Sequence, residues 1–344
     1  MTNLNYKAWA IAMDQRGFSL TELLVAMFMA ALVGMAGYVV FSTSNRSYMT
    51  QGDVSEAQQN VRVAMDRLAS DIRTAGFGLP NPPFSLAIGG QNWTAPVTVT
   101  NNAAGPDTIT LLGIGFQAGT LVAPGGVPCN RKGDSIICMN SVASFFPGGM
   151  FNANTIFINV GGAQFIQLAG ATLATNQLNL NPPNTLEGPA NGIPIPAGTP
   201  VYIIQAVQYT INTALPGCSV LNPCLASNDF TGLRGVGLQV LTENIEDIQF
   251  AYGLDATPRD GVLDDANLDG AYTAADFLNA PAGSSDIIAV RANILSRTRN
   301  PDPNGANLFT RPALEDRPAA AVQDGFRRRL LTKVITLRNF RLEP

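Results

Sequence analysis

An uninterrupted apolar segment near the N-terminus constrains this 344-residue chain more than any other feature. The segment runs from Phe18 to Phe41 and carries a single charged residue, Glu22. A leader with Lys7 and Arg16 precedes it and ends at Gly17. At 1.5 Å per residue, a helix of this length extends about 36 Å, which is enough to cross the hydrocarbon core of a bilayer. The sequence therefore predicts a single-pass membrane protein.

The position of the small residue Gly17 separates this leader from an ordinary signal peptide. A secretory signal peptide has its small-residue cleavage site after the apolar run. Here Gly17 precedes the run, so cleavage after it would leave the apolar helix on the mature protein.

Residues 16–22 read Arg-Gly-Phe-Ser-Leu-Thr-Glu, which resembles the prepilin signature of type IV pilins and type II secretion pseudopilins. The resemblance implies that a prepilin peptidase removes residues 1–17 by cutting between Gly17 and Phe18. It also implies that the new Phe18 amine is N-methylated, and that the helix carries the chain from the inner membrane into a filament.

Glu22 needs a partner, because a lone carboxylate in hydrocarbon costs about 2.5–3.5 kcal/mol. The apolar run contains no Lys or Arg to pair with it. The resemblance supplies a partner from outside the chain, namely the Phe18 ammonium of a neighbouring subunit in a stacked filament. The alternative is a tolerated charge near the helix start, where it favours the N-terminal dipole.

The helix is predicted to continue beyond the membrane, over residues 42–75, because this stretch has no proline and a periodic apolar face. The spacing of that face is typical of an amphipathic helix, and its members are Val54, Val61, Met65, Leu68, Ile72 and Ala75. Gly76, Gly78 and Pro80 then end it. We expect the face to pack on the chain's own globular domain, with a coiled-coil seam as the alternative.

Residues 80–344 are predicted to form a β-rich domain with long loops, because the chain has 33 glycines and 23 prolines and short β-like runs between turn residues. The expected strands lie near residues 108–114, 155–160, 201–211, 237–241, 245–252, 286–295 and 330–337. The predicted fold class is α+β, with one long N-terminal helix of residues 18–79 and a pilin-like globular domain.

Three segments of the chain narrow the resemblance to the PilW family of minor pilins. They are residues 62–76, 243–253 and 327–339. PilW proteins are similar to the J-type pseudopilin of type II secretion. The resemblance implies a place in a priming complex at the pilus tip, with other minor and major pilins and a large adhesin as partners.

Composition excludes several function classes. There is no histidine, the net charge is −4, and no catalytic motif occurs. We therefore expect neither an enzyme nor a nucleic-acid binder. Glu243, Glu246 and Asp247 are interpreted as solvated acids beside a strand rather than as a glycosidase pair. The basic residues Arg327, Arg328, Arg329, Lys333, Arg338 and Arg341 are interpreted as an exposed strand face rather than a contact to DNA or anionic lipid.

The four cysteines fall into two close pairs, Cys129 with Cys138 and Cys218 with Cys224. Neither pair is C-x-x-C, and the chain has no histidine to complete a zinc site. Two short-loop disulfides fit an exported protein, each contributing about 2–3 kcal/mol. The alternative is four reduced, buried cysteines.

Residues 265–276 match the calcium-loop pattern D-x-[DN]-x-[DN]-G with an acid at the twelfth position. Gly270 allows the sharp turn, and Thr273 stands at the water-linked ninth position. The predicted ligands are the oxygens of Asp265, Asn267, Asp269, the Ala271 carbonyl and Asp276. The alternative is an acidic, solvated turn without a metal.

Three functions therefore fit the sequence. The first is a structural subunit that primes or caps a type IV pilus at the cell surface. The second is a J-type pseudopilin of a type II secretion system, and the third is a pilus-tip binding module for DNA or surface ligands.

Overall fold

The computed structural model describes residues 19–79, 84–88, 91–126, 128–146, 151, 156–162, 164–189, 192–232, 237–256, 260–271, 273–281, 286–302 and 307–337. The predicted processing site at Gly17 and Phe18 lies outside these residues, as do Arg338 and Arg341. The chain forms two compact units, residues 1–52 and residues 53–344.

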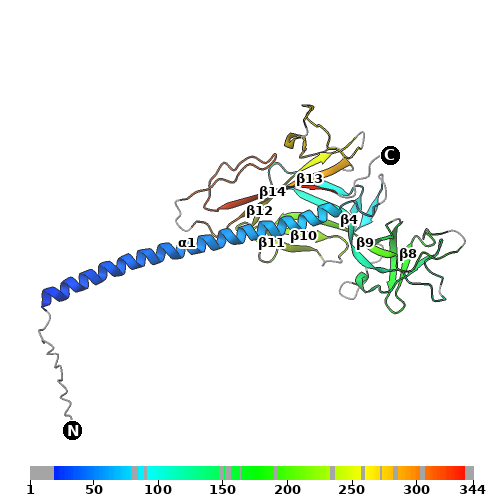
Figure 1. Ribbon diagram of the computed structural model, residues 1–344, viewed down its shortest axis with the longest axis horizontal. Coiled ribbons are helices and arrows are strands. Elements are labelled where there is room, and N and C mark those ends of the chain that lie inside the picture. The colour runs from blue at the N-terminus through cyan, green and yellow to red at the C-terminus, as the bar shows by residue number, and fades with distance from the viewer. Residues whose placement is uncertain are drawn as a thin grey trace, which may run out of the picture. The chain divides into compact units, whose positions relative to one another are not determined.

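One long helix, α1 (Leu20–Thr74), contributes to both units and is the first element in Figure 1. Its bounds lie close to the predicted 18–75. The second unit therefore begins within the helix and includes its amphipathic part, residues 53–74. The predicted α+β architecture, one long helix followed by a β-rich domain, is confirmed.

The strands form a large nine-stranded sheet, a three-stranded sheet and a small two-stranded hairpin. The hairpin pairs β1 (Leu86–Ile88) with β2 (Gln91–Trp93). The large sheet has the order β11-β10-β9-β6-β7-β8-β5, and β3-β4 joins it through β9. Its strands are β3 (Val97–Thr100), β4 (Thr108–Thr120), β5 (Ile136–Cys138), β6 (Phe157–Val160), β7 (Gln164–Thr172), β8 (Gln177–Asn181), β9 (Pro200–Asn212), β10 (Cys224–Asp229) and β11 (Leu238–Glu243).

The three-stranded sheet is antiparallel and contains β12 (Ile245–Leu254), β13 (Ile287–Arg297) and β14 (Arg328–Thr336). Two short 3-10 helices, η1 (Ala143–Phe145) and η3 (Ala274–Asp276), lie in connections. Each of the seven predicted strand segments contains a strand. The shorter or amide-rich strands, such as β7 and β8, were not predicted, because Gln, Asn and small residues occupy many of their positions.

The apolar face of α1 is buried in the main core of the second unit. Val61, Met65, Leu68 and Ile72 are each at most 5 % exposed. They pack with one face of the three-stranded sheet and with β4, β9 and β10, through residues such as Ile109, Tyr209, Leu225, Ile248, Phe250, Val290, Ala292, Ile294 and Ile335. The 3.6-residue period thus places this helix face on the domain. It packs within the chain as predicted, and not as a coiled-coil seam.

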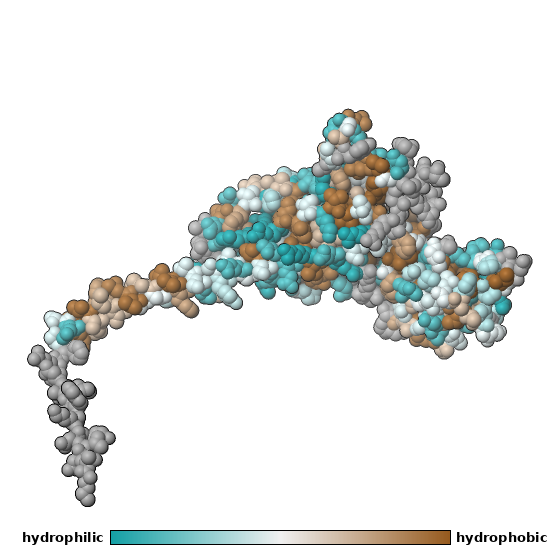
Figure 2. All heavy atoms as spheres, viewed as in Figure 1, coloured by the Kyte–Doolittle hydropathy of each residue, from teal (hydrophilic) through white to brown (hydrophobic). Residues whose placement is uncertain are grey.

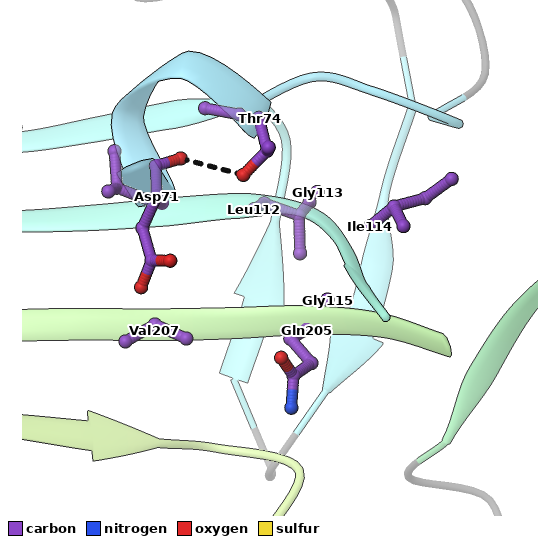
Figure 3. Close-up of a pocket in the computed structure, with 10 residues that line it drawn as sticks. Asp71, Thr74, Leu112, Gly113, Ile114, Gly115, Gln205 and Val207 are labelled. Atoms are coloured by element: carbon purple, nitrogen blue, oxygen red, sulfur yellow. Dashed lines mark hydrogen bonds between the residues drawn. The ribbon is translucent and has the colours of Figure 1, made fainter. Parts of the chain in front are cut away.

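The C-terminal end of α1 sits directly on β4. Gly113 allows this approach, because a Cβ at that position would lie 2.5 Å from the carbonyl oxygen of Thr74. Gly76 donates its N–H to Leu112 at 2.8 Å, which continues the contact past the helix end. A small pocket at this junction is lined by residues that include Asp71, Gly113 and Gln205 (Figure 3).

A second lobe with its own core lies beyond the end of α1 (Figure 1). Its buried residues run from Ala118 to Ile203 in sequence and come from β4 to β9. Residues 116–200 contain four charged side chains, namely Arg131, Lys132, Asp134 and Glu187. This lobe therefore has few charged side chains, and the amides of Asn and Gln supply much of its polarity.

Candidate functional site

The first part of α1 is an apolar surface without cover from the rest of the chain. Its large apolar side chains from Leu20 to Phe41 are exposed, including Leu24, Phe28 and Val33. Figure 2 shows this stretch as a brown rod. The most apolar 18-residue window of the helix is not buried at all, and by length and composition the helix can cross a membrane. Such a surface requires lipid or other helices around it.

Glu22 lies in the first turn of α1, and Ser19 caps that turn. The Glu22 backbone N–H donates to Ser19 Oγ at 3.2 Å and to the Ser19 carbonyl at 3.1 Å. Residues 19–22 thus place a Ser and a Glu at the spacing of a capping box, a signal that the sequence analysis did not use. Within the described part of the chain, no Lys or Arg forms an ion pair with the Glu22 carboxylate.

Both predicted disulfides are present. Cys129 joins Cys138, and Cys218 joins Cys224, with Cα–Cα distances of 5.8 and 5.7 Å. The first joins the segment before β5 to the last residue of β5 in the second lobe, and the second closes the loop between β9 and β10. Cys129, Cys138 and Cys224 are buried.

The predicted calcium loop is closed by its own hydrogen bonds. The Asp265 carboxylate accepts the N–H groups of Asp269 at 3.1 Å and Gly270 at 2.7 Å. Asn267 Nδ2 donates to Asp269 Oδ2 at 2.9 Å. Gly270 has φ +82°, the conformation that the predicted sharp turn requires.

Asp276 is the buried end of this loop. It is 1 % exposed, and its carboxylate accepts the N–H groups of Thr273 at 2.5 Å and Asn267 at 3.4 Å. These bonds, the one from Thr273 foremost, hold the pKa of Asp276 below its usual range. Across the described ranges, however, no three acidic or sulfur side chains gather closely enough to form a metal site by themselves.

A polar network on the three-stranded sheet was not foreseen from the sequence. It occupies the face opposite α1, where Asp247, Gln249, Arg291 and Asn293 lie beneath the connection from β13 to β14. Asp247 is fully buried, and its Oδ2 lies 2.5 Å from Arg317 Nη1 and 3.6 Å from Arg311 Nη1. Burial nevertheless raises the pKa of Asp247, and the interpretation of this residue as a solvated acid is wrong.

The same connection is held at further points by arginines. Arg291 pairs with Glu315 at 2.6 Å and Arg327 with Asp302 at 2.7 Å. Arg328 pairs with Glu246 at 2.6 Å, and only 6 % of its side chain is exposed. The prediction of an exposed basic face is therefore wrong for Arg328, because two carboxylates, those of Glu246 and Asp324, draw it inward.

Asp107 joins the large sheet to the three-stranded sheet. Its carboxylate accepts the N–H groups of Asn102 and Phe250, each at 2.8 Å, and its own N–H donates to Ile248 at 2.9 Å. The side chain is 1 % exposed, and burial raises its pKa to about 6. Burial and the nearby Asp107 also raise the pKa of Tyr252. These groups join the two sheets.

Comparisons with known proteins agree with these features. Residues 206–339 match the family described as Type IV Pilus-assembly protein W, and residues 12–38 match the prokaryotic N-terminal methylation motif. No curated protein matches the sequence. A structure of a type IV-like pilin from Thermus thermophilus aligns over 82 % of this chain and 97 % of its own, at 12 % identity and a TM-score of 0.35.

The processing motif and the uncovered apolar helix place the chain among the type IV pilin-like proteins. The match to the PilW family spans the second half of β9 and all of β10, β11, β12, β13 and β14. The match is to a pilus-assembly family rather than to a family of enzymes.

Proposed function

We propose that this protein is a minor pilin that primes or caps type IV pilus assembly as part of a tip complex. The observation that carries the proposal is the division of α1, which buries one apolar face in the chain's own core and leaves its first part bare. A helix of this kind needs neighbouring helices once it leaves the membrane. Other minor and major pilins are the partners that would supply them.

The second lobe supports a terminal position in such a filament. It lies beyond the C-terminal end of α1 (Figure 1), and we infer that a following subunit would have to stack on that side. Repeated stacking requires that this space be free at every subunit. A subunit at the end of the filament does not face that restriction, and a large adhesin is a suitable neighbour there.

Deletion of the protein tests this role. We expect far fewer surface pili, restored by the intact chain, with protein secretion unaffected. Normal pilus number together with lost secretion of exported enzymes would instead assign the chain to a type II secretion pseudopilus. Immunogold labelling should place the protein at filament ends, and labelling along the whole filament would contradict the capping role.

Processing and location follow from the same proposal. The precursor is inserted in the inner membrane, a prepilin peptidase cuts between Gly17 and Phe18, and the mature subunit enters a pilus that reaches the cell surface. Mass spectrometry of the mature protein should find a methylated Phe18 terminus. An intact Met1 would contradict this route.

We also propose that the loop of residues 265–276 binds one calcium ion. Its oxygens suit a hard cation, and calcium accepts six to eight of them. The turn at Gly270 and the ring of bonds around Asp265 support this reading. The role would be structural, fixing the connection between β12 and β13.

A further inference from the structure

The loop between β9 and β10 holds two adjacent large apolar side chains in solvent. Val220 is 77 % exposed and Leu221 is 70 % exposed. Single exposed apolar residues are common on protein surfaces and need no explanation. This pair differs because residues 213–223 contain no charged side chain and several interactions fix the loop.

The loop is locked from within. The disulfide between Cys218 and Cys224 closes it, and Ser219 and Asn222 exchange backbone hydrogen bonds of 2.9 and 3.0 Å across its tip. Asn222 Nδ2 also donates to the Gly217 carbonyl at 2.7 Å and to Glu243 Oε2 at 3.2 Å. A segment fixed in this way loses little entropy when a partner covers it.

A buried arginine holds the tip from outside. Arg297 Nη2 donates to the Val220 carbonyl at 2.7 Å, and the guanidinium lies 4.4 Å from the ring centre of Phe326. Arg297 is 7 % exposed. Burial of a charged group is expensive without compensation, so this residue stabilises one particular position of the tip.

The loop lies beside α1. Glu243, which contacts the loop, accepts a hydrogen bond from Asn60 Nδ2 through its carbonyl at 3.1 Å. Next to Arg297, Ser296 Oγ donates to the Ala57 carbonyl at 2.9 Å. An open hollow near Ala57 is lined by Val54, Ala57, Thr298, Phe309 and Arg327–Arg329.

We propose that Val220 and Leu221 form a docking contact for the helix of a neighbouring pilin-type subunit. The inference rests on the proposed assembly role and adds the surface by which the globular unit takes part in it. A pilin-type helix that packs along α1 near Ala57 and Asn60 meets this loop. The absence of charge on the loop favours such an occupant over nucleic acid or lipid headgroups, which require basic groups.

A photo-crosslinking amino acid at position 221 of the full chain, in piliated cells, identifies the occupant. We expect an adduct with another pilin-type subunit, mapped by mass spectrometry to its helix. Leu173, an exposed apolar residue at the turn between β7 and β8, is the matched control and should give no such adduct. An adduct with a protein outside the pilin class, or none from filaments that contain the chain, overturns the proposal.

The double variant Val220→Ser/Leu221→Ser tests the energetic weight of the contact. We expect unchanged membrane abundance, both disulfides intact, and a drop of about tenfold in incorporation into sheared filaments. Leu173→Ser should be incorporated normally. If the double variant misfolds, the single variants Val220→Ser and Leu221→Ser replace it in the test. Normal incorporation of the double variant overturns the docking contact alone. Absence of the wild-type chain from filaments overturns the assembly role itself.

Discussion

The two parts of α1 differ in composition and in surroundings. In residues 53–74 the apolar side chains form one face, and the chain's own sheets bury it. In residues 20–41 apolar side chains occupy all sides of the helix and none is buried. A helix that is apolar all round requires an apolar environment on every side.

This difference separates stability from assembly within a single helix. Side chains with partners inside the chain, such as Leu68, contribute to the folding of the globular unit. Side chains without such partners, such as Leu24 and Glu22, contribute only when lipid or another subunit surrounds them. Substitutions in the two parts should therefore act on different measurements.

The largest effect is expected from Leu68→Ala. Leu68 is fully buried in the core, so the cavity and the lost burial should lower the free energy of unfolding by about 2–5 kcal/mol. Leu24→Ala in the bare part should leave that free energy unchanged. Denaturation of the processed chain in detergent measures both, and the fluorescence of the buried Trp93 reports on the globular unit. Equal destabilisation by the two variants would remove the distinction.

Asp107 provides a carboxylate whose partners all lie within the chain. Its pKa is raised from 3.8 to about 6 in the folded state, so the folded protein binds the proton more tightly than the unfolded protein does. The contribution of this group to stability is therefore full below pH 4, falls as the pH rises to about 6, and then stays low. By linkage the loss is about 3 kcal/mol.

Asp107→Asn isolates this contribution because it removes the titration. The stability of the wild type relative to the variant should fall between pH 4 and pH 7, as measured by denaturant unfolding at several pH values. Asp66→Asn, whose side chain on α1 is 80 % exposed, is a suitable control for a carboxylate outside the core. A constant difference between the wild type and Asp107→Asn across this range would contradict the shifted pKa.

Much of this division was predictable from sequence, because it rests on local periodicity. The spacing of Val61, Met65, Leu68 and Ile72 predicted the buried face, and the short separations of the cysteines predicted both disulfides. The burial of Asp247 was not predictable. Its partners Arg311 and Arg317 are distant in sequence, and only the path of the connection between β13 and β14 brings them to it.

Glu22→Ala tests the bare part of α1 directly. Membrane insertion should be unchanged, because removal of a carboxylate makes the segment more apolar. Incorporation into filaments should fall about tenfold if the carboxylate pairs with the Phe18 ammonium of a neighbour, since an ion pair in hydrocarbon loses one partner. Thr21→Ala is the matched control at the helix start. Wild-type incorporation of Glu22→Ala would refute the pairing.

The smallest effect is expected from calcium at the loop of residues 265–276. This loop is a second place, after Glu22, where we propose that polar groups bind a partner from outside the chain. Calcium at ten times its dissociation constant should raise the free energy of unfolding by about 1.4 kcal/mol, because it binds the folded state only. Millimolar concentrations are appropriate, since an isolated loop closed by Asp276 is a weaker site than one closed by Glu.

The controls decide whether such a stabilisation comes from this loop. Asp265→Asn and Asp269→Asn keep an acceptor for the loop's own N–H bonds but remove ligand charge, so they should fold and lose the calcium effect. Asp260→Asn, a nearby acid outside the ligand set, should retain it. Magnesium should stabilise less, because it requires a stricter octahedral geometry. If calorimetry detects no calcium binding to the intact chain, the proposed site is wrong. The hydrogen bonds around Asp265 then complete the loop by themselves, and its acidic side chains, like Leu68 and Asp107, have all their partners inside the chain.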